Sequence, residues 1–174
     1  MRTLFVVACV VCASVASAYA APWTGTVIRV RSGDTMTVKR DGARIQVTLF
    51  GVECPEKRQP YAEEARKLTR SLVDGQVVTV SPVSEDKKGV VAKVSLMKTE
   101  VIEVLRGGRR DQRKVKVPVR VREELVRAGL AWQRPEAGGD KRLAKLQARA
   151  RHAKRGLWAD PNPTPPWEWG KKSK

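Results

Sequence analysis

Alternating hydrophobic and polar positions in the first half of the chain predict β-structure. Ile45, Val47 and Leu49 alternate with polar residues between positions 44 and 50, and this period of two indicates a half-buried strand. The Asp41-Gly42 dipeptide before this segment favours a tight hairpin turn. The same criteria predict further strands over residues 24–31, 34–40, 76–83 and 90–97.

A helical period replaces this alternation in three segments. Ala62, Ala65, Leu68 and Leu72 recur at three- and four-residue spacing and predict a helix over residues 61–73. Similar spacing predicts helices over residues 121–128 and 140–155, each followed by a glycine that ends it. The proline- and tryptophan-rich residues 159–174 predict an irregular tail packed by its tryptophans.

The order of these elements predicts an α+β fold. Three strands, a helix, two strands and then further helices suit a five-stranded Greek-key barrel of the OB type with packed helices. Two more strand-like segments flank an arginine- and glycine-rich stretch, which predicts a protruding β-hairpin inserted at about residues 100–121. Pro118 places its strand at a sheet edge, because proline cannot donate to a sheet ladder.

The first 20 residues have the pattern of a secretory signal peptide. Arg2 precedes a short apolar run, and Ala18-Tyr19-Ala20 provides a small-residue cleavage site. The apolar run is short for a membrane span, so a retained anchor is the weaker alternative. We expect cleavage after residue 20, export to the periplasm or the exterior, and a mature domain over residues 21–158. Cys54 would then be the only cysteine, and we expect a buried, passive thiol rather than a redox or nucleophilic group.

The chain is strongly basic, and its positive charge is concentrated in two segments. The 174 residues include 35 Lys and Arg against 18 Asp and Glu, and removal of the signal lowers the net charge only from +17 to +16. Residues 106–122 carry +7 and residues 139–155 carry +6, which indicates an electrostatic footprint for an anionic partner. Nucleic acid is the first expectation, with lipopolysaccharide or another acidic polymer and a merely solvated helix face as alternatives, and we expect a monomer. The predicted nucleic-acid-binding side chains are Arg106, Arg109, Arg110, Arg113, Lys114, Lys116, Arg142, Lys145 and Arg149.

Three carboxylates lie at the ends of neighbouring predicted strands. Asp34 begins one strand, and Glu53 and Glu56 follow another. Carboxylate oxygens are the ligands that Ca²⁺ prefers, so the three side chains indicate a candidate hard-cation site. The single His and the small number of cysteines argue against a zinc centre.

The segments that hold these acids belong to a series of short motifs along the chain. In order, the motifs are Gly33-Asp34-Thr35, Gly51-Val52-Glu53-Cys54-Pro55-Glu56, Gln59-Pro60-Tyr61, Gly129-Leu130-Ala131 and Gly156-Leu157-Trp158. Together they resemble the staphylococcal nuclease (thermonuclease) family. The resemblance implies an OB barrel and a Ca²⁺-dependent phosphodiesterase that cuts DNA and RNA. It implies Asp34 and Glu53 as calcium ligands, Thr35 as a further ligand through its carbonyl, and Glu56 as the carboxylate that handles the attacking water.

The departures from the family pattern concern its two catalytic arginines. Thr48 and Val90 stand where the family has arginine. Neither offers the planar, bidentate fork with which arginine grips a phosphate. Loss of one transition-state donor costs roughly 10²–10³ in rate.

Three functions follow from these departures. The first is a secreted nuclease-like OB-fold protein that binds nucleic acid through a basic surface, with weak or absent phosphodiester hydrolysis. The alternatives are an active Ca²⁺-dependent endonuclease that uses arginines of the 106–113 hairpin, and an envelope protein that binds other polyanions.

Overall fold

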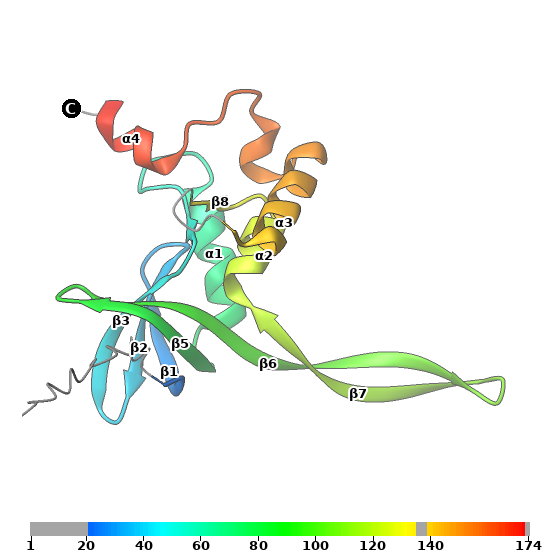
Figure 1. Ribbon diagram of the computed structural model, residues 1–174. Coiled ribbons are helices and arrows are strands. Elements are labelled where there is room, and N and C mark those ends of the chain that lie inside the picture. Colours follow the sequence, from blue (N-terminus) through cyan, green and yellow to red (C-terminus); the bar gives the residue numbers. More distant parts are fainter. Residues whose placement is uncertain (1–20, 135–138, 173–174) are drawn as a thin grey trace, which may run out of the picture.

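A three-stranded meander begins the fold. The computed structural model describes residues 21–134 and 139–172 (Figure 1). Strand β1 (Trp23–Val30) pairs antiparallel with β2 (Thr35–Arg40), which pairs antiparallel with β3 (Ala43–Leu49). Asp41 and Gly42 join β2 to β3 with φ of 47° and 83°, the left-handed values that the tightest hairpin turn requires.

Two later strands close the meander into a barrel. Strand β5 (Val77–Asp86) pairs with β1, and β6 (Gly89–Arg106) pairs with β5. The start of β6 also runs parallel to β3, with Val47 opposite Val90 and Leu49 opposite Ala92. Strands β1, β2, β3, β6 and β5 therefore form a closed ring, which confirms the predicted α+β fold with a five-stranded OB-type barrel.

The core fills this ring and extends under the first two helices. Its side chains are mainly valines, because the inward positions of the short strands are β-branched and fit a pleated surface. Helix α1 (Ala62–Val73) contributes Ala65 and Val73, and α2 (Val121–Arg127) contributes Leu125 and Val126. The fully buried barrel residues include Val27, Met36, Val38, Val47, Val78, Val80 and Ala92.

The outer half of β6 pairs with β7 (Arg109–Arg120) in a long ribbon, which we call the arm. The pairing runs without a break from Ser95 opposite Arg120 to Arg106 opposite Arg109. The arm projects from the barrel and helices (Figure 1). The predicted strand 90–97 and the first strand of the predicted hairpin belong to one strand of 18 residues, because the hairpin pairing continues through the polar residues between them.

The C-terminal part adds to the main core through α3 (Lys141–His152) and also holds a second, smaller cluster of Trp132, Ala150, Leu157 and Trp158. Helix α3 begins at Asp140, whose carboxylate accepts hydrogen bonds from the N–H groups of Arg142 and Leu143 at 3.2 and 3.1 Å. The short strands β4 (Val52–Glu53) and β8 (Trp132–Gln133) pair beneath it, and a 3₁₀ turn, η2 (Gly156–Ala159), follows it.

The tail corrects one prediction. Helix α4 (Pro166–Lys172) replaces the expected irregular segment, and Pro166 stands at its first position, where a missing N–H is tolerated. As expected, a tryptophan of the tail packs on the rest of the chain: the ring centre of Trp167 lies 5.9 Å from that of Trp132, which in turn lies 4.4 Å from that of Trp158. In the described part of the chain, no helix combines the length and the apolar character needed to cross a membrane.

Candidate functional site

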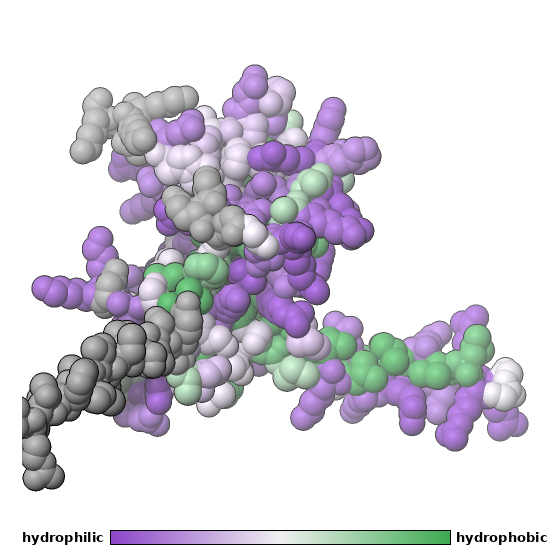
Figure 2. Space-filling view, viewed as in Figure 1, coloured by the Kyte–Doolittle hydropathy of each residue, from purple (hydrophilic) through white to green (hydrophobic). Residues whose placement is uncertain are grey.

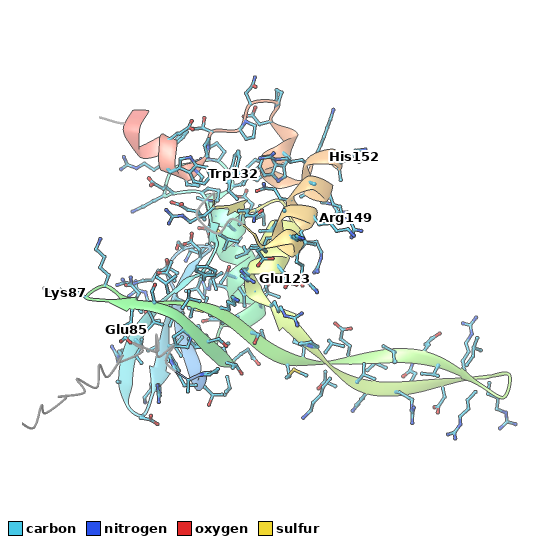
Figure 3. All side chains as sticks on the ribbon, in the orientation of Figure 1. Glu85, Lys87, Glu123, Trp132, Arg149 and His152 are labelled. Atoms are coloured by element: carbon cyan, nitrogen blue, oxygen red, sulfur yellow. The ribbon has the colours of Figure 1, made fainter. Side chains whose placement is uncertain are left out.

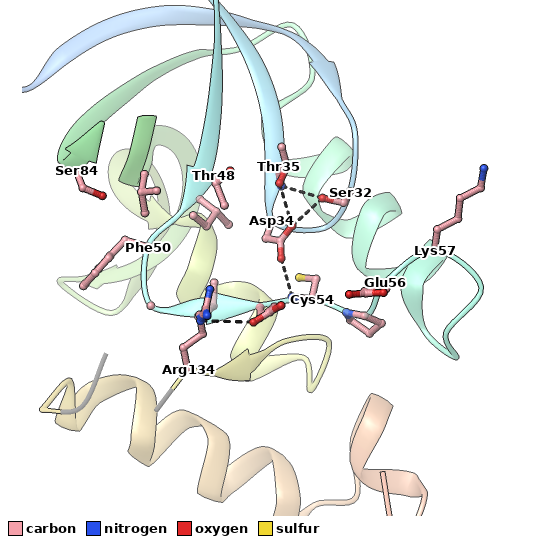
Figure 4. Close-up of a pocket in the computed structure, with 16 residues that line it drawn as sticks. Ser32, Asp34, Thr35, Thr48, Phe50, Cys54, Glu56, Lys57, Ser84 and Arg134 are labelled. Carbon is pink, nitrogen blue, oxygen red and sulfur yellow. Dashed lines mark hydrogen bonds and ion pairs between the residues drawn. The ribbon is translucent and has the colours of Figure 1, made fainter. Parts of the chain in front are cut away.

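A pocket of about 530 Å³ opens where the turn between β1 and β2 meets the end of β3 and the loop after β4 (Figure 4). The structure brings the three predicted carboxylates together here, since Asp34, Glu53 and Glu56 all line this pocket. Thr35 and Thr48 also line it. The two motif segments that hold the three carboxylates, Gly33-Asp34-Thr35 and Gly51–Glu56, therefore meet at one hollow.

Close packing explains the glycine in the turn that holds Asp34. A Cβ atom on Gly33 would lie 2.6 Å from Cys54 Sγ and 2.7 Å from Ala65 Cβ, which is closer than real contacts allow. The hydroxyl of buried Thr69 on α1 donates to the Gly33 carbonyl at 2.5 Å. Helix α1 and the segment that follows β4 thus fix this turn, and with it the position of the neighbouring carboxylate.

The carboxylate of Asp34 already accepts three hydrogen bonds from the protein. One oxygen accepts from the hydroxyls of Ser32 at 2.7 Å and Thr35 at 3.2 Å, and the other accepts from the backbone N–H of Cys54 at 2.8 Å (Figure 4). The last bond ties the turn to the residue directly after β4. The side chain therefore acts as a clamp between two segments that are 20 residues apart in sequence.

Arg134 is the site residue that the sequence analysis missed. It follows β8 and lines the pocket, and its Nε lies 3.5 Å from Glu53 Oε2 (Figure 4). The pairing of β8 with β4 places Glu53 opposite Trp132, two residues before this arginine. The available signal was its position three residues after the Gly129-Leu130-Ala131 motif.

Glu56 and Lys57 lie on the exposed loop that forms the rim of the pocket. The side chain of Gln59 is 6% exposed; its carbonyl accepts from the Glu56 N–H at 3.0 Å and its amide donates to the Thr164 carbonyl at 2.6 Å. The C-terminal segment therefore supports the loop and the carboxylate that the family resemblance assigns to the attacking water.

Threonine and valine occupy the positions where the family pattern has arginines. Thr48 lines the pocket beside Val91, its partner in the parallel pairing of β3 with β6. Val90 is 4% exposed and belongs to the barrel core. These two positions offer one hydroxyl and no cation.

The oxygen atoms that the family resemblance implies as Ca²⁺ ligands are engaged in contacts within the protein. Both oxygens of Asp34 accept protein hydrogen bonds, and Glu53 contacts a guanidinium. The Thr35 carbonyl accepts from the N–H groups of Arg31 at 2.9 Å and Ser32 at 3.2 Å, so it is committed to the turn. Within residues 21–134 and 139–172, no three Asp, Glu, His or Cys side chains are grouped to hold a metal ion.

Cys54 is buried at the back of the pocket, with 4% of its surface exposed. Burial raises the pKa of its thiol well above the usual value, and the nearby charges of Asp34 and Glu53 raise the pKa further. The protonated thiol is neither a good nucleophile nor a good metal ligand. The expectation of a passive thiol agrees with this environment.

The predicted basic residues lie outside the pocket. Those of the arm, at positions 106, 109, 110, 113, 114 and 116, are exposed along the projecting ribbon and none lines the pocket. The lining of the pocket therefore includes no arginine of the 106–113 hairpin. On α3, Arg142, Lys145 and Arg149 are all exposed to solvent, and Arg142 Nε also donates to buried Glu123 at 2.8 Å. Figure 3 labels Arg149 and Glu123.

Known proteins are similar to this chain over most of its length. The family model described as "Staphylococcal nuclease homologue" matches residues 46–160. An "Uncharacterized endonuclease" of Escherichia coli is 34% identical over 147 residues, which cover 83% of each chain. "Protein ParB" of Escherichia coli is 31% identical over 91% of this chain and 85% of its own length. "Micrococcal nuclease" of Shigella flexneri is 28% identical over 88% of this chain and 84% of its own.

Proposed function

Because the chain belongs to the staphylococcal nuclease family, we propose that it binds nucleic acid through its basic surface and hydrolyses phosphodiesters weakly or not at all. Family membership supports a nucleic-acid-related nuclease function.

One observation carries it: the pocket wall has Thr48 and Val91 side by side, and Val90 belongs to the core. A pentavalent or metaphosphate-like phosphoryl group spreads negative charge over its equatorial oxygens, and catalysis consists largely of stabilising that charge. A threonine hydroxyl and two valines cannot do what two guanidinium forks do. We expect a rate at least about 10² below that of a family member that keeps both arginines.

The arm is the part of the basic surface best shaped for nucleic acid. A two-stranded ribbon fits the major groove of duplex DNA. Along the arm, Val101 lies opposite Lys114 and Leu105 lies opposite Arg110, so aliphatic and basic side chains run side by side. Figure 2 shows the resulting hydrophobic band along the arm between hydrophilic side chains. The basic row suits phosphates, and the aliphatic row suits base edges and sugars.

Equilibrium binding and cleavage, measured on the same preparation of residues 21–174, test the proposal. We expect binding of a labelled oligonucleotide that weakens with salt, by a log–log slope of about −0.7 for each phosphate contacted on a single strand. We expect plasmid DNA to stay intact at high protein concentration in millimolar Ca²⁺. Salt-insensitive binding, or none, would overturn the binding claim. Rapid nicking that chelation abolishes would overturn the claim of weak hydrolysis.

Arg134 favours a second candidate function, an active nuclease in which this arginine contacts the phosphate. The observation is its place in the pocket, beside Glu53. This candidate predicts measurable cleavage that Arg134→Ala and Glu56→Gln both abolish without weakening oligonucleotide binding. Cleavage that survives Arg134→Ala would remove this arginine from the chemistry.

Export and the nature of the polyanion are further proposals. We propose that residues 1–20 direct export and are removed, and N-terminal sequencing of the protein from its native cells tests this. A start at residue 21 is expected, and a retained Met1 would contradict it. Competition tests the partner: DNA should displace lipopolysaccharide or an acidic glycan from the basic surface, and failure to do so would favour an envelope role.

A further inference from the structure

A second basic surface lies on the outer face of the meander, away from the arm and from α3. Strands β1, β2 and β3 enclose a shallow groove of about 700 Å³, which we call the meander groove. Four of its lining residues are cations and none is an acid. The lining residues are Ile28, Arg29, Arg31, Thr37, Lys39, Gly42, Arg44 and Gln46.

A β-bulge in β1 creates this groove. Val27 lies opposite Val38, but Arg29 lies opposite Thr37, so β1 holds one extra residue at this point. A bulge shifts the alternation of side chains by one position. Val27 and Val30 therefore both face the core, whereas Ile28 and Arg29 are both exposed. Without the bulge, the alternation from Val27 would turn the arginine at position 29 inward.

The register of the meander then gathers the cations. Thr37 lies beside Arg29 on one side and Gln46 on the other, and Lys39 lies opposite Arg44. Arg31 extends across to β3, where its Nη1 donates to Gln46 Oε1 at 2.6 Å. This bond orients one guanidinium, and the lining of the groove has no carboxylate to neutralise the four positive charges.

The meander groove is continuous with the pocket. A hollow of about 650 Å³ beside the α1 N-terminus shares Arg31 with the groove. The same hollow shares Ser32, Pro55 and Lys57 with the pocket. One track therefore runs from the pocket, past Lys57 and Arg31, onto the outer face of the meander.

We propose that the meander groove binds the phosphate backbone of a nucleic acid strand whose next phosphodiester lies in the pocket. This inference rests on the proposed function and adds the path of the strand. The cations match a polyanion, and the continuous track matches a flexible single strand better than a rigid duplex. The lining has no aromatic residue on which a base would stack, so we expect binding that is independent of sequence.

Paired alanine variants test the inference. Arg29→Ala/Arg44→Ala removes two exposed cations of the groove, and Lys67→Ala/Lys87→Ala removes two exposed cations that line none of these three hollows. The readout is the salt dependence of binding to a single-stranded oligonucleotide of about 12 nucleotides, a length within the range that one OB fold covers. Thermal unfolding of each variant checks that the fold persists.

Two lost phosphate contacts should make the log–log salt slope shallower by about 1.4. When the salt is raised from about 50 to 200 mM, the affinity of the unmodified chain falls by some factor. The factor for the groove pair should be roughly sevenfold smaller. The groove pair should show this change and the control pair should not. Equal slopes for the groove pair and the unmodified chain, with binding intact, would overturn the groove while leaving the proposed function standing. Absence of binding by the unmodified chain would overturn the proposed function itself.

Discussion

Replacement of Asp34 by alanine separates a structural clamp from a metal ligand. The carboxylate accepts from the Ser32 and Thr35 hydroxyls and from the Cys54 N–H, and no calcium is needed for these bonds. Asp34→Ala removes the acceptor for all three donors. In a metal site, by contrast, several carboxylates repel one another when the ion is absent. Removal of one of them would then raise the stability of the metal-free protein.

The size of the effect follows from those bonds. A hydrogen bond to a charged acceptor contributes about 1.5–3 kcal/mol, and a donor left without a partner costs a similar amount only where it is buried. The side chain is half-buried and the three contributions are not additive, so we expect a loss of about 2–4 kcal/mol. For a domain of this size, that lowers the Tm by roughly 5–15 °C.

Thermal unfolding in chelator measures this loss. Asp111→Ala provides the control, because Asp111 is exposed on the arm and should change stability by less than about 0.5 kcal/mol. We also expect the Tm of the unmodified chain to be the same in chelator and in millimolar Ca²⁺. An ion at about 100 times its Kd would add about 2.7 kcal/mol. Two results together would refute the clamp and support Asp34 as a metal ligand: an Asp34→Ala variant as stable as the unmodified chain, and a calcium-dependent rise in the Tm of the unmodified chain.

Three further predictions concern the turn, the arm and the thiol. Gly33→Ala should destabilise the chain by about 1–3 kcal/mol through overpacking, measured by urea unfolding, and a neutral effect would mean that α1 moves freely. Arg109→Ala/Arg110→Ala should make the salt slope for single strands shallower by about 1.4, and a slope equal to that of the lysine control pair would remove the arm from phosphate binding. The raised pKa of Cys54 means that the unfolded chain loses the thiol proton first as pH rises, so stability should fall above about pH 9. Cys54→Ala should abolish that part of the decline in unfolding free energy, and an unchanged pH profile would contradict the assignment.

The sequence predicted the parts of the site that local signals determine. The Asp41-Gly42 turn, the period-two strands and the order of elements identified the barrel, and the barrel places Asp34, Glu53 and Glu56 in one pocket. These features depend on residues that are neighbours in sequence or on motifs that recur in order. Their prediction needed no knowledge of tertiary contacts.

The parts that were missed depend on long-range pairing. Arg134 reaches the pocket only because the two-residue strands β4 and β8 pair, and strands this short have no visible periodicity. The sequence does not reveal the bulge that exposes Arg29, because the residues around Val27 are compatible with a strand that has the bulge and with one that lacks it. The engagement of Asp34 by the Cys54 N–H likewise arises only when the turn and the end of β4 meet.

The single-turnover rate of phosphodiester cleavage tests the central claim most directly. Residues 21–174, in excess over a labelled single-stranded oligonucleotide and with millimolar Ca²⁺, should bind the strand and leave it uncut on the time scale on which a comparison enzyme, a nuclease of the family with arginine at both positions, cleaves it. We expect a rate constant at least about 10² lower than that of the comparison enzyme, because no guanidinium stands at positions 48 and 90. A rate constant within about tenfold of that enzyme would contradict the account, because the pocket would then stabilise the transition state without the two lost arginines.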